Sequence, residues 1–129
     1  MNQYIGTSTL VVNDYDEVIR FYTEKLLFEL IEDTTLSDTK RWVLVAPKGW
    51  HECCILLAKA ANEEQRSRVG NQTGGRVVLF LYTDDFWRDY NGMIKRGVKF
   101  IRPPAEENYG TVAVFEGLYG NFWDLIEKI

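Results

Sequence analysis

The chain has 129 residues, a length typical of one compact domain with a single core. Its hydrophobic fraction of 46% and charged fraction of 26% are ordinary for a globular protein, and its apolar runs are too short for a transmembrane helix. The net charge is −4, with Lys and Arg dispersed among acidic residues, which argues against a nucleic-acid partner. Residues 1–6 lack a secretory signal pattern, so we expect a cytoplasmic protein without a membrane partner.

The two cysteines and the single histidine do not indicate a disulfide or a catalytic site. Cys53 and Cys54 are adjacent, and neighbouring residues of a strand point to opposite faces, so they cannot form an ordinary disulfide. We expect both to be small buried hydrophobic residues. His51 lies in the turn 48–52, and we expect it to be solvated. A Ser/His/Asp or Cys/His catalytic set is therefore not indicated.

The first half of the chain predicts a strand, a helix and three further strands. Residues 7–12 form a strand pattern, and Asn13 and Asp14 provide a turn and a helix N-cap. Apolar residues at three- and four-residue spacing predict a helix over residues 15–26. Strand-like runs separated by polar or Pro/Gly turns follow at 28–32, 41–46 and 53–59.

The second half repeats this order. Residues 61–75 are polar, contain a charged segment that suggests a helical turn, and end in glycines, so they form a candidate linker. A strand over 76–82, a cap at Asp84–Asp85 and a helix over 86–96 follow, and Gly97 provides the C-cap. The buried face of this helix is expected to carry Phe86, Tyr90, Met93 and Ile94. The remaining strands are expected at 98–101, 111–115 and 122–126.

The two halves match with a shift of about 70 residues, because Asp14 then falls on Asp84 and residues 28–30 fall on 98–100. This predicts an α+β fold of two βαβββ repeats, about 5–60 and 76–127, in a single domain. A four-stranded sheet with one helix on one face leaves its other face uncovered. Two such sheets are expected to form a curved groove that holds a ligand.

Two segments carry a family resemblance. Residues 10–14 followed by 21–30 (FYTEKLLFEL) resemble the opening of vicinal oxygen chelate proteins, which have a strand, an Asp and an F-Y-x-x-x-L-G-F motif; here Leu27 replaces the usual Gly. Residues 118–127 (LYGNFWDLIE) resemble the closing motif of that superfamily. The superfamily includes glyoxalase I, bleomycin resistance proteins and dioxygenases, so the resemblance implies the fold but leaves the chemistry open.

The resemblance also implies where a divalent metal ion would bind. The four positions match Thr7, approximately Leu56, Val78 or Phe80, and Asp124. Leu, Val and Phe offer no lone pair, and catalytic metal sites usually need three protein ligands. We therefore expect neither a metal ion nor another cofactor.

Strand alternation indicates what the groove offers instead. Its floor is expected to carry Thr7 and Thr9, Leu56, and Phe80 and Tyr82, with Asp124 on the last strand. An apolar, aromatic floor with one acid suits a small hydrophobic or aromatic molecule. The alternative is that Phe80 and Tyr82 fill the interior between the sheets.

Asp124 and Tyr109 complete the candidate site. Asp124 interrupts an apolar strand, where a carboxylate needs a partner; the alternatives are a structural pair with Arg76 or Arg41, and a role toward a ligand or as an acid/base. Tyr109 lies after the segment 103–107, which is expected to be a loop, and is a candidate lid residue or a surface turn.

The sequence therefore predicts a metal-independent protein, similar to bleomycin resistance proteins, that binds a small molecule. One alternative is a lyase, isomerase or dioxygenase of the same fold that uses Asp124 as an acid/base or has a non-standard metal site. Another is an interaction module whose groove is filled. A homodimer is expected, because two-fold pairing would protect sheet edges.

Overall fold

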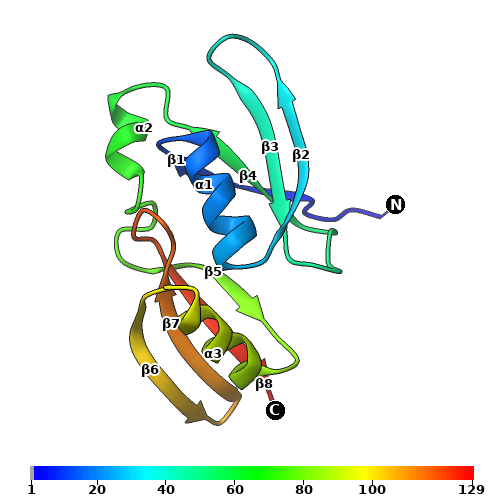
Figure 1. Cartoon of the computed structure of the whole chain (residues 1–129), viewed down its shortest axis with the longest axis vertical. Helices are drawn as coiled ribbons and strands as arrows, with labels where there is room; N and C mark the ends of the chain where they lie inside the picture. The colour runs from blue at the N-terminus through cyan, green and yellow to red at the C-terminus, as the bar shows by residue number, and fades with distance from the viewer. Residues whose placement is uncertain (1) are drawn as a thin grey trace. The chain divides into compact units, whose positions relative to one another are not determined.

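A computed structural model of the chain describes residues 2–129. The chain divides into two compact units, the first ending at Val69 and the second running from Gly70 to Ile129. Each unit holds a four-stranded mixed sheet, which confirms the α+β class and the repeated βαβββ order (Figure 1). That the two units make one domain remains a prediction. In residues 2–129, no helix is long and apolar enough to cross a membrane.

The first unit has the strand order β1-β4-β3-β2. Strands β1 and β4 are parallel, and the other neighbours are antiparallel. This places β1 and β2 at the edges of the sheet. The elements are β1 (Thr7–Val12), α1 (Tyr15–Arg20), the π-helical turn η1 (Phe21–Lys25), β2 (Glu29–Thr35), β3 (Arg41–Ala46), β4 (Cys54–Lys59) and α2 (Glu63–Arg68).

The second unit has the equivalent order β5-β8-β7-β6. Its parallel pair is β5 and β8, and β5 and β6 are the edges. The elements are β5 (Val77–Tyr82), α3 (Phe86–Lys95), β6 (Phe100–Glu107), β7 (Gly110–Glu116) and β8 (Phe122–Lys128).

The predicted helix caps are confirmed. An Asp14 carboxylate oxygen accepts a hydrogen bond from the amide of Glu17 at 2.7 Å, and Asp85 accepts from the amide of Arg88 at 3.1 Å. Each satisfies an amide that the first helical turn leaves without a partner. Gly97 has a φ of +90°, the left-handed conformation expected of a C-cap glycine.

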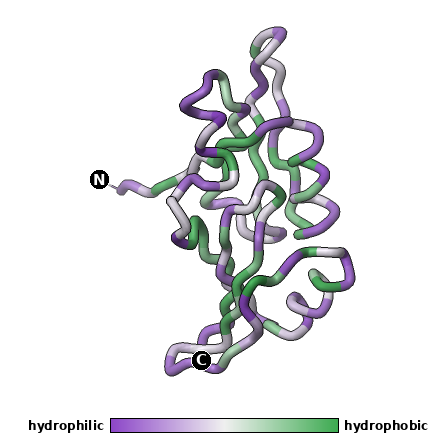
Figure 2. The backbone as a smooth tube through the Cα atoms, turned by 90° about the vertical axis from the view of Figure 1, so that its left-hand side faces the viewer, coloured by the Kyte–Doolittle hydropathy of each residue, from purple (hydrophilic) through white to green (hydrophobic). Residues whose placement is uncertain are grey.

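The helix of each unit covers one face of its sheet. In the first unit Val18 and Tyr22 are buried, and in the second Phe86 and Met93 are. Figure 2 shows hydrophobic and hydrophilic positions alternating along the helical turns, as an amphipathic helix requires. The prediction for Ile94 was wrong: it is 47% exposed, because it lies further round the helix than Phe86 and Met93.

Three other details differ from the sequence predictions. The helix predicted over 15–26 widens at its end into a π-helical turn, in which the Leu26 amide donates to the carbonyl of Phe21, five residues earlier, at 3.3 Å. Cys53 is exposed, because β4 begins only at Cys54, which is buried. The segment 103–107 is not a loop but the second part of β6. Prolines are tolerated there because β6 is an edge strand, where one side needs no amide donor.

Candidate functional site

The candidate site is built on the face of the second sheet that points away from α3. The ring of Tyr90 on α3 lies 4.6 Å from that of Phe100, which marks the helix-covered face. Residues that alternate to the other face form what we call the helix-distal face of the second sheet. It carries Phe80, Tyr82, Arg102, Val112, Val114, Asp124 and Ile126.

Aromatic side chains are exposed on this face. Phe80 and Tyr82, on the edge strand β5, are each 55% exposed, whereas Val114 and Ile126 are buried. The Lys128 ammonium lies 4.8 Å from the centre of the Tyr82 ring, a cation–π contact. Within residues 2–129, Phe80 makes no ring contact. The Phe80 ring is therefore available for a ligand.

Asp124 lies in the middle of the helix-distal face. It is in register with Phe80 on β5 and with Val114 on β7, so its close neighbours are apolar. Burial raises the pKa of the Asp124 carboxyl above its ordinary value, and the positive charge of Arg102 partly opposes this shift. The carboxyl is thus closer to its neutral form than an exposed aspartate would be.

The structural pairs considered for Asp124 are not formed. Arg41 instead donates to Asp16 and Asp33, and all three belong to the first unit. In the described part of the chain, Asp124 forms no ion pair or hydrogen bond through its side chain, with Arg76 or with any other residue. An internal salt bridge therefore does not explain this acid.

The first sheet also has a helix-distal face, which carries Thr7, Thr9 and Leu56. The register pairs Thr7 with Cys54 and Thr9 with Leu56. Both threonines are exposed, and Leu56 is half-buried. These three residues thus lie on the face of their own sheet that alternation predicted.

The residues at the four positions that bind metal in related enzymes do not fit a divalent ion. Thr7 is a weak ligand, Leu56 and Phe80 have no donor atom, and only Asp124 offers a carboxylate. Among residues 2–129, no group of three or more His, Cys, Asp or Glu side chains is arranged to hold a metal ion. No reaction step is therefore assigned to a metal.

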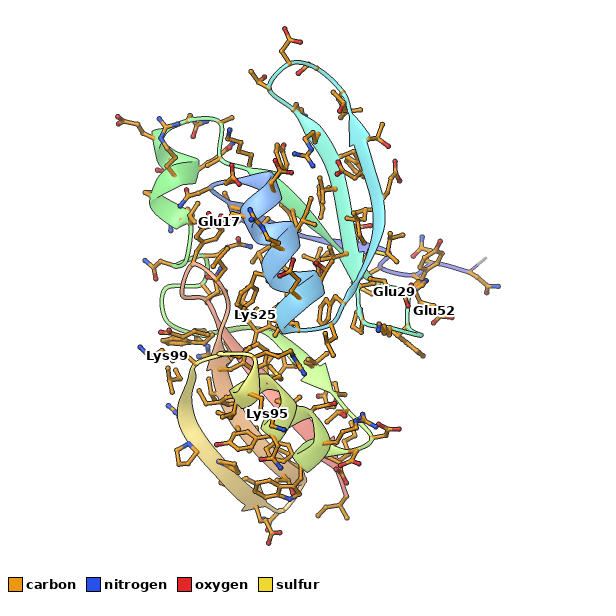
Figure 3. The ribbon with its side chains drawn as sticks, viewed as in Figure 1. Glu17, Lys25, Glu29, Glu52, Lys95 and Lys99 are labelled. Carbon is orange, nitrogen blue, oxygen red and sulfur yellow. The ribbon has the colours of Figure 1, made fainter. Side chains whose placement is uncertain are left out.

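Tyr109 and His51 lie outside the helix-distal face of the second sheet. Tyr109 is 57% exposed in the short turn between β6 and β7, and its carbonyl accepts from the Ile129 amide at 3.2 Å. His51 is half-exposed, and its Nε2 lies 3.3 Å from a Glu29 carboxylate oxygen. Figure 3 shows Glu29 and Glu52 at the same end of the first sheet. The sequence did not indicate the His51–Glu29 pair, because it joins residues on separate elements.

The sequence also missed Arg102. It pairs in register with Val114 on β7, after an irregularity that follows the Phe100–Phe115 pair. That shift brings Arg102 to the helix-distal face, near enough for its charge to act on Asp124. No pattern in the sequence signals the shift, since residues 103–107 had the composition of a loop.

Comparisons with known proteins agree with this fold. A family model described as "Glyoxalase/Bleomycin resistance protein/Dioxygenase superfamily" matches residues 4–125. An uncharacterized protein of Shewanella frigidimarina (strain NCIMB 400) is 60% identical over 128 residues, which is 98% of this chain and 95% of that protein. The crystal structure of UcmS2 matches with a TM-score of 0.86 and 31% identity over 98% of both chains. TnmS3, an antibiotic binding protein from Streptomyces sp. CB03234, matches with a TM-score of 0.79 and 26% identity, over 99% of this chain and 98% of that chain.

Proposed function

The chain belongs to the Glyoxalase/Bleomycin resistance protein/Dioxygenase superfamily, and on that premise we propose that it binds a small, mostly aromatic molecule without a metal ion and without catalysing a reaction. The main support for this proposal is the helix-distal face of the second sheet, where Phe80 and Tyr82 are exposed beside Asp124. An exposed ring offers a stacking surface, and the carboxyl fixes a donor or a cationic nitrogen.

The similarity to an antibiotic binding protein supports the same class of function. TnmS3 shares the fold over nearly the whole chain, and its described role is binding. Small-molecule sites are lined mostly by apolar and aromatic side chains, with a few polar groups that fix the orientation of the ligand. We propose an equivalent role for the present chain, with the ligand still to be identified.

Other residues are proposed as further ligand contacts. Thr7 and Thr9 offer hydroxyl groups, and Leu56 offers apolar surface on the helix-distal face of the first sheet. Tyr109, in the turn between β6 and β7, is proposed as a lid residue. Alanine substitution at each position tests each contact separately.

A second candidate function follows from the raised pKa of Asp124. A carboxyl that holds its proton more tightly is better suited to act as a general acid or base near neutral pH. The chain would then be an enzyme of the same fold. Incubation of the purified protein with each bound compound, followed by chromatography and NMR spectroscopy of the recovered compound, distinguishes the two: a binding protein returns the compound unchanged.

Thermal unfolding with a panel of aromatic compounds tests the proposed function. A ligand that binds only the folded chain raises the melting temperature, by an amount that grows with the logarithm of its concentration over Kd. Phe80→Ala should reduce the shift, and Trp87→Ala is the matched control, because Trp87 is 53% exposed on the helix α3. Equal shifts in both variants and the wild type would place binding elsewhere and contradict the proposal.

We also propose that the protein is a homodimer that acts in the cytoplasm. The support for the dimer comes from the uncharged edge strands β1 and β5, which offer backbone groups to a partner.

A further inference from the structure

Four residues of the second unit form a row straight across its sheet. Phe80 is in register with Asp124, Asp124 with Val114, and Val114 with Arg102. The strands are ordered β5-β8-β7-β6, so the row runs from one edge of the sheet to the other. All four residues belong to the helix-distal face. The row therefore presents a ring, an acid, an aliphatic side chain and a guanidinium in that order.

The spacing of the row follows from sheet geometry. Neighbouring strands lie about 4.8 Å apart, so the backbones of Asp124 and Arg102 are separated by about 10 Å and those of Phe80 and Arg102 by about 14 Å. An ion pair between Asp124 and Arg102 is not formed at this separation, although the Arg102 charge acts on the carboxyl. Val114, which is buried, lies between them as an apolar floor.

Arg102 is the unexplained member of the row. Its side chain is exposed on an edge strand, and within residues 2–129 it forms no ion pair or hydrogen bond. By contrast, Arg41 and Arg88 are both held by carboxylates. A guanidinium binds carboxylates and other anionic oxygens in a forked geometry that a neutral group does not match. The free guanidinium is thus suited to an acidic group of a ligand.

We propose that Arg102 is a specificity-determining residue, and that the site selects planar aromatic acids. In such a ligand one end of the ring system packs against Phe80 and its hydroxyl or amine donates to Asp124. The rest of the ring lies over Val114, and a carboxylate at the far end binds Arg102. The molecule spans about 10 Å, roughly the length of two fused rings with a substituent at each end. This inference rests on the proposed function, because it uses the same face for binding.

Three probes with the same naphthalene ring test the inference by isothermal titration calorimetry. They are 6-hydroxy-2-naphthoic acid, its methyl ester, and 2-naphthol. The wild-type protein should bind the acid about 10-fold or more tightly than the ester, as a charge-assisted hydrogen bond predicts. Arg102→Met should weaken binding of the acid about 10-fold and leave the ester and 2-naphthol unchanged, and Arg102→Lys should restore part of the preference.

The matched control is Arg66→Met, which removes the same charge from the exposed helix α2 of the first unit. Its binding of all three probes should equal that of the wild type, apart from a small long-range effect of charge. If the ester and 2-naphthol bind through Phe80 but the acid binds no more tightly, the role of Arg102 is overturned and the proposed function stands. Equal weakening of all three probes by Arg102→Met also overturns it. If none of the probes binds, both this inference and the aromatic-binding function are contradicted.

Discussion

The guanidinium of Arg41 donates two hydrogen bonds to the carboxylate of Asp33 in a bidentate geometry. Its Nε donates to Oδ1 at 3.1 Å and its Nη2 to Oδ2 at 2.7 Å, while Nη1 donates to Asp16 at 2.9 Å. The guanidinium also lies 5.1 Å from the centre of the Tyr15 ring. One side chain of β3 thereby joins the neighbouring strand β2 to the first turn of α1. We expect this network to stabilise the first unit more than an isolated surface pair would.

Loss of the Arg41–Asp33 pair should make the protein less stable and less sensitive to acid. The hydrogen bonds from Arg41 hold the pKa of the Asp33 carboxyl below its ordinary value of 3.8. A lowered pKa contributes stability that is present above pH 3.8 and lost as the pH falls through the folded-state pKa. Asp33→Asn should therefore lower the free energy of unfolding by about 1 kcal/mol at pH 7, and by less at pH 3.

Urea unfolding at both pH values measures this difference. Asp38→Asn is the control, because Asp38 is exposed and forms no ion pair in the described chain. Its stability should match that of the wild type at pH 7. A similar loss for both variants would show that the effect reflects net charge and not the pair.

Leu27 carries a strain that a glycine would relieve. Its φ of +58° is left-handed, which costs a residue with a Cβ about 1–2 kcal/mol, and its side chain is 42% exposed. Leu27→Gly should therefore stabilise the protein by up to about 1 kcal/mol, once the greater flexibility of glycine in the unfolded chain is counted. Thermal unfolding measures the gain.

A glycine-to-alanine substitution at another residue with a positive φ is the control for Leu27→Gly. Gly110 has a φ of +149°, and a Cβ added there would lie 2.1 Å from the carbonyl oxygen of Glu127. Gly110→Ala should destabilise the protein by several kcal/mol, because the contact is with backbone. A loss of stability in Leu27→Gly would mean that burial of the Leu27 side chain outweighs the strain.

Local signals were enough to predict most of the fold. Asp14, Asp85 and Gly97 cap their helices because capping depends only on residues three or four positions away. The 70-residue shift then gave the repeated order of strands. Residues 103–107 were misassigned, because two prolines weaken the local strand signal and only pairing with β7 restores it.

The candidate site depended on contacts that the sequence does not show. Alternation placed Phe80, Tyr82 and Asp124 on one face, since that needs only the strand period of two. Arg102 was missed because its face depends on a register shift between β6 and β7. The pair of Asp124 with Arg41, one of the alternatives considered, is not formed, because Asp16 and Asp33 bind Arg41.

Asp124→Asn should separate a binding role from a structural one. The raised pKa of Asp124 means that the folded chain holds this proton more tightly than the unfolded chain, so the stabilising contribution is present below pH 3.8 and is lost as the pH rises through the folded-state pKa. At pH 7 the Asn variant should therefore be as stable as the wild type or slightly more stable. Binding of a probe that donates to the carboxyl should weaken by about 1–3 kcal/mol. A large loss of stability with unchanged affinity would identify a structural acid.

Metal analysis should find no stoichiometric divalent ion. Thr7, Leu56 and Phe80 supply no strong ligand, which leaves one carboxylate, Asp124, against the three protein ligands of a usual catalytic site. Elemental analysis of the purified protein should give far less than one ion per chain, and the probe affinities should be the same with and without a chelator. Close to one zinc, nickel, iron or manganese ion per chain, removable with loss of binding, would contradict the prediction.

The edge strands lead to the prediction of a homodimer. The edges β2 and β6 are protected, the first by Glu29, Glu32 and Asp33 and the second by its prolines and two terminal glutamates. The edges β1 and β5 contain no charged residue and no proline. The backbone N–H and C=O groups of such edges are able to pair with another chain, so we expect a second copy to cover them.

Light scattering coupled to gel filtration at micromolar concentration tests the dimer. The mass should be near twice the 15.0 kDa of one chain. Thr9→Lys puts a charge on the unprotected edge β1 and should shift the mass toward that of one chain. Thr34→Lys, an exposed position on the protected edge β2, should leave it unchanged. A wild-type mass near 15.0 kDa would rule the dimer out, and a dimer that both variants retain would mean that β1 is not part of its interface.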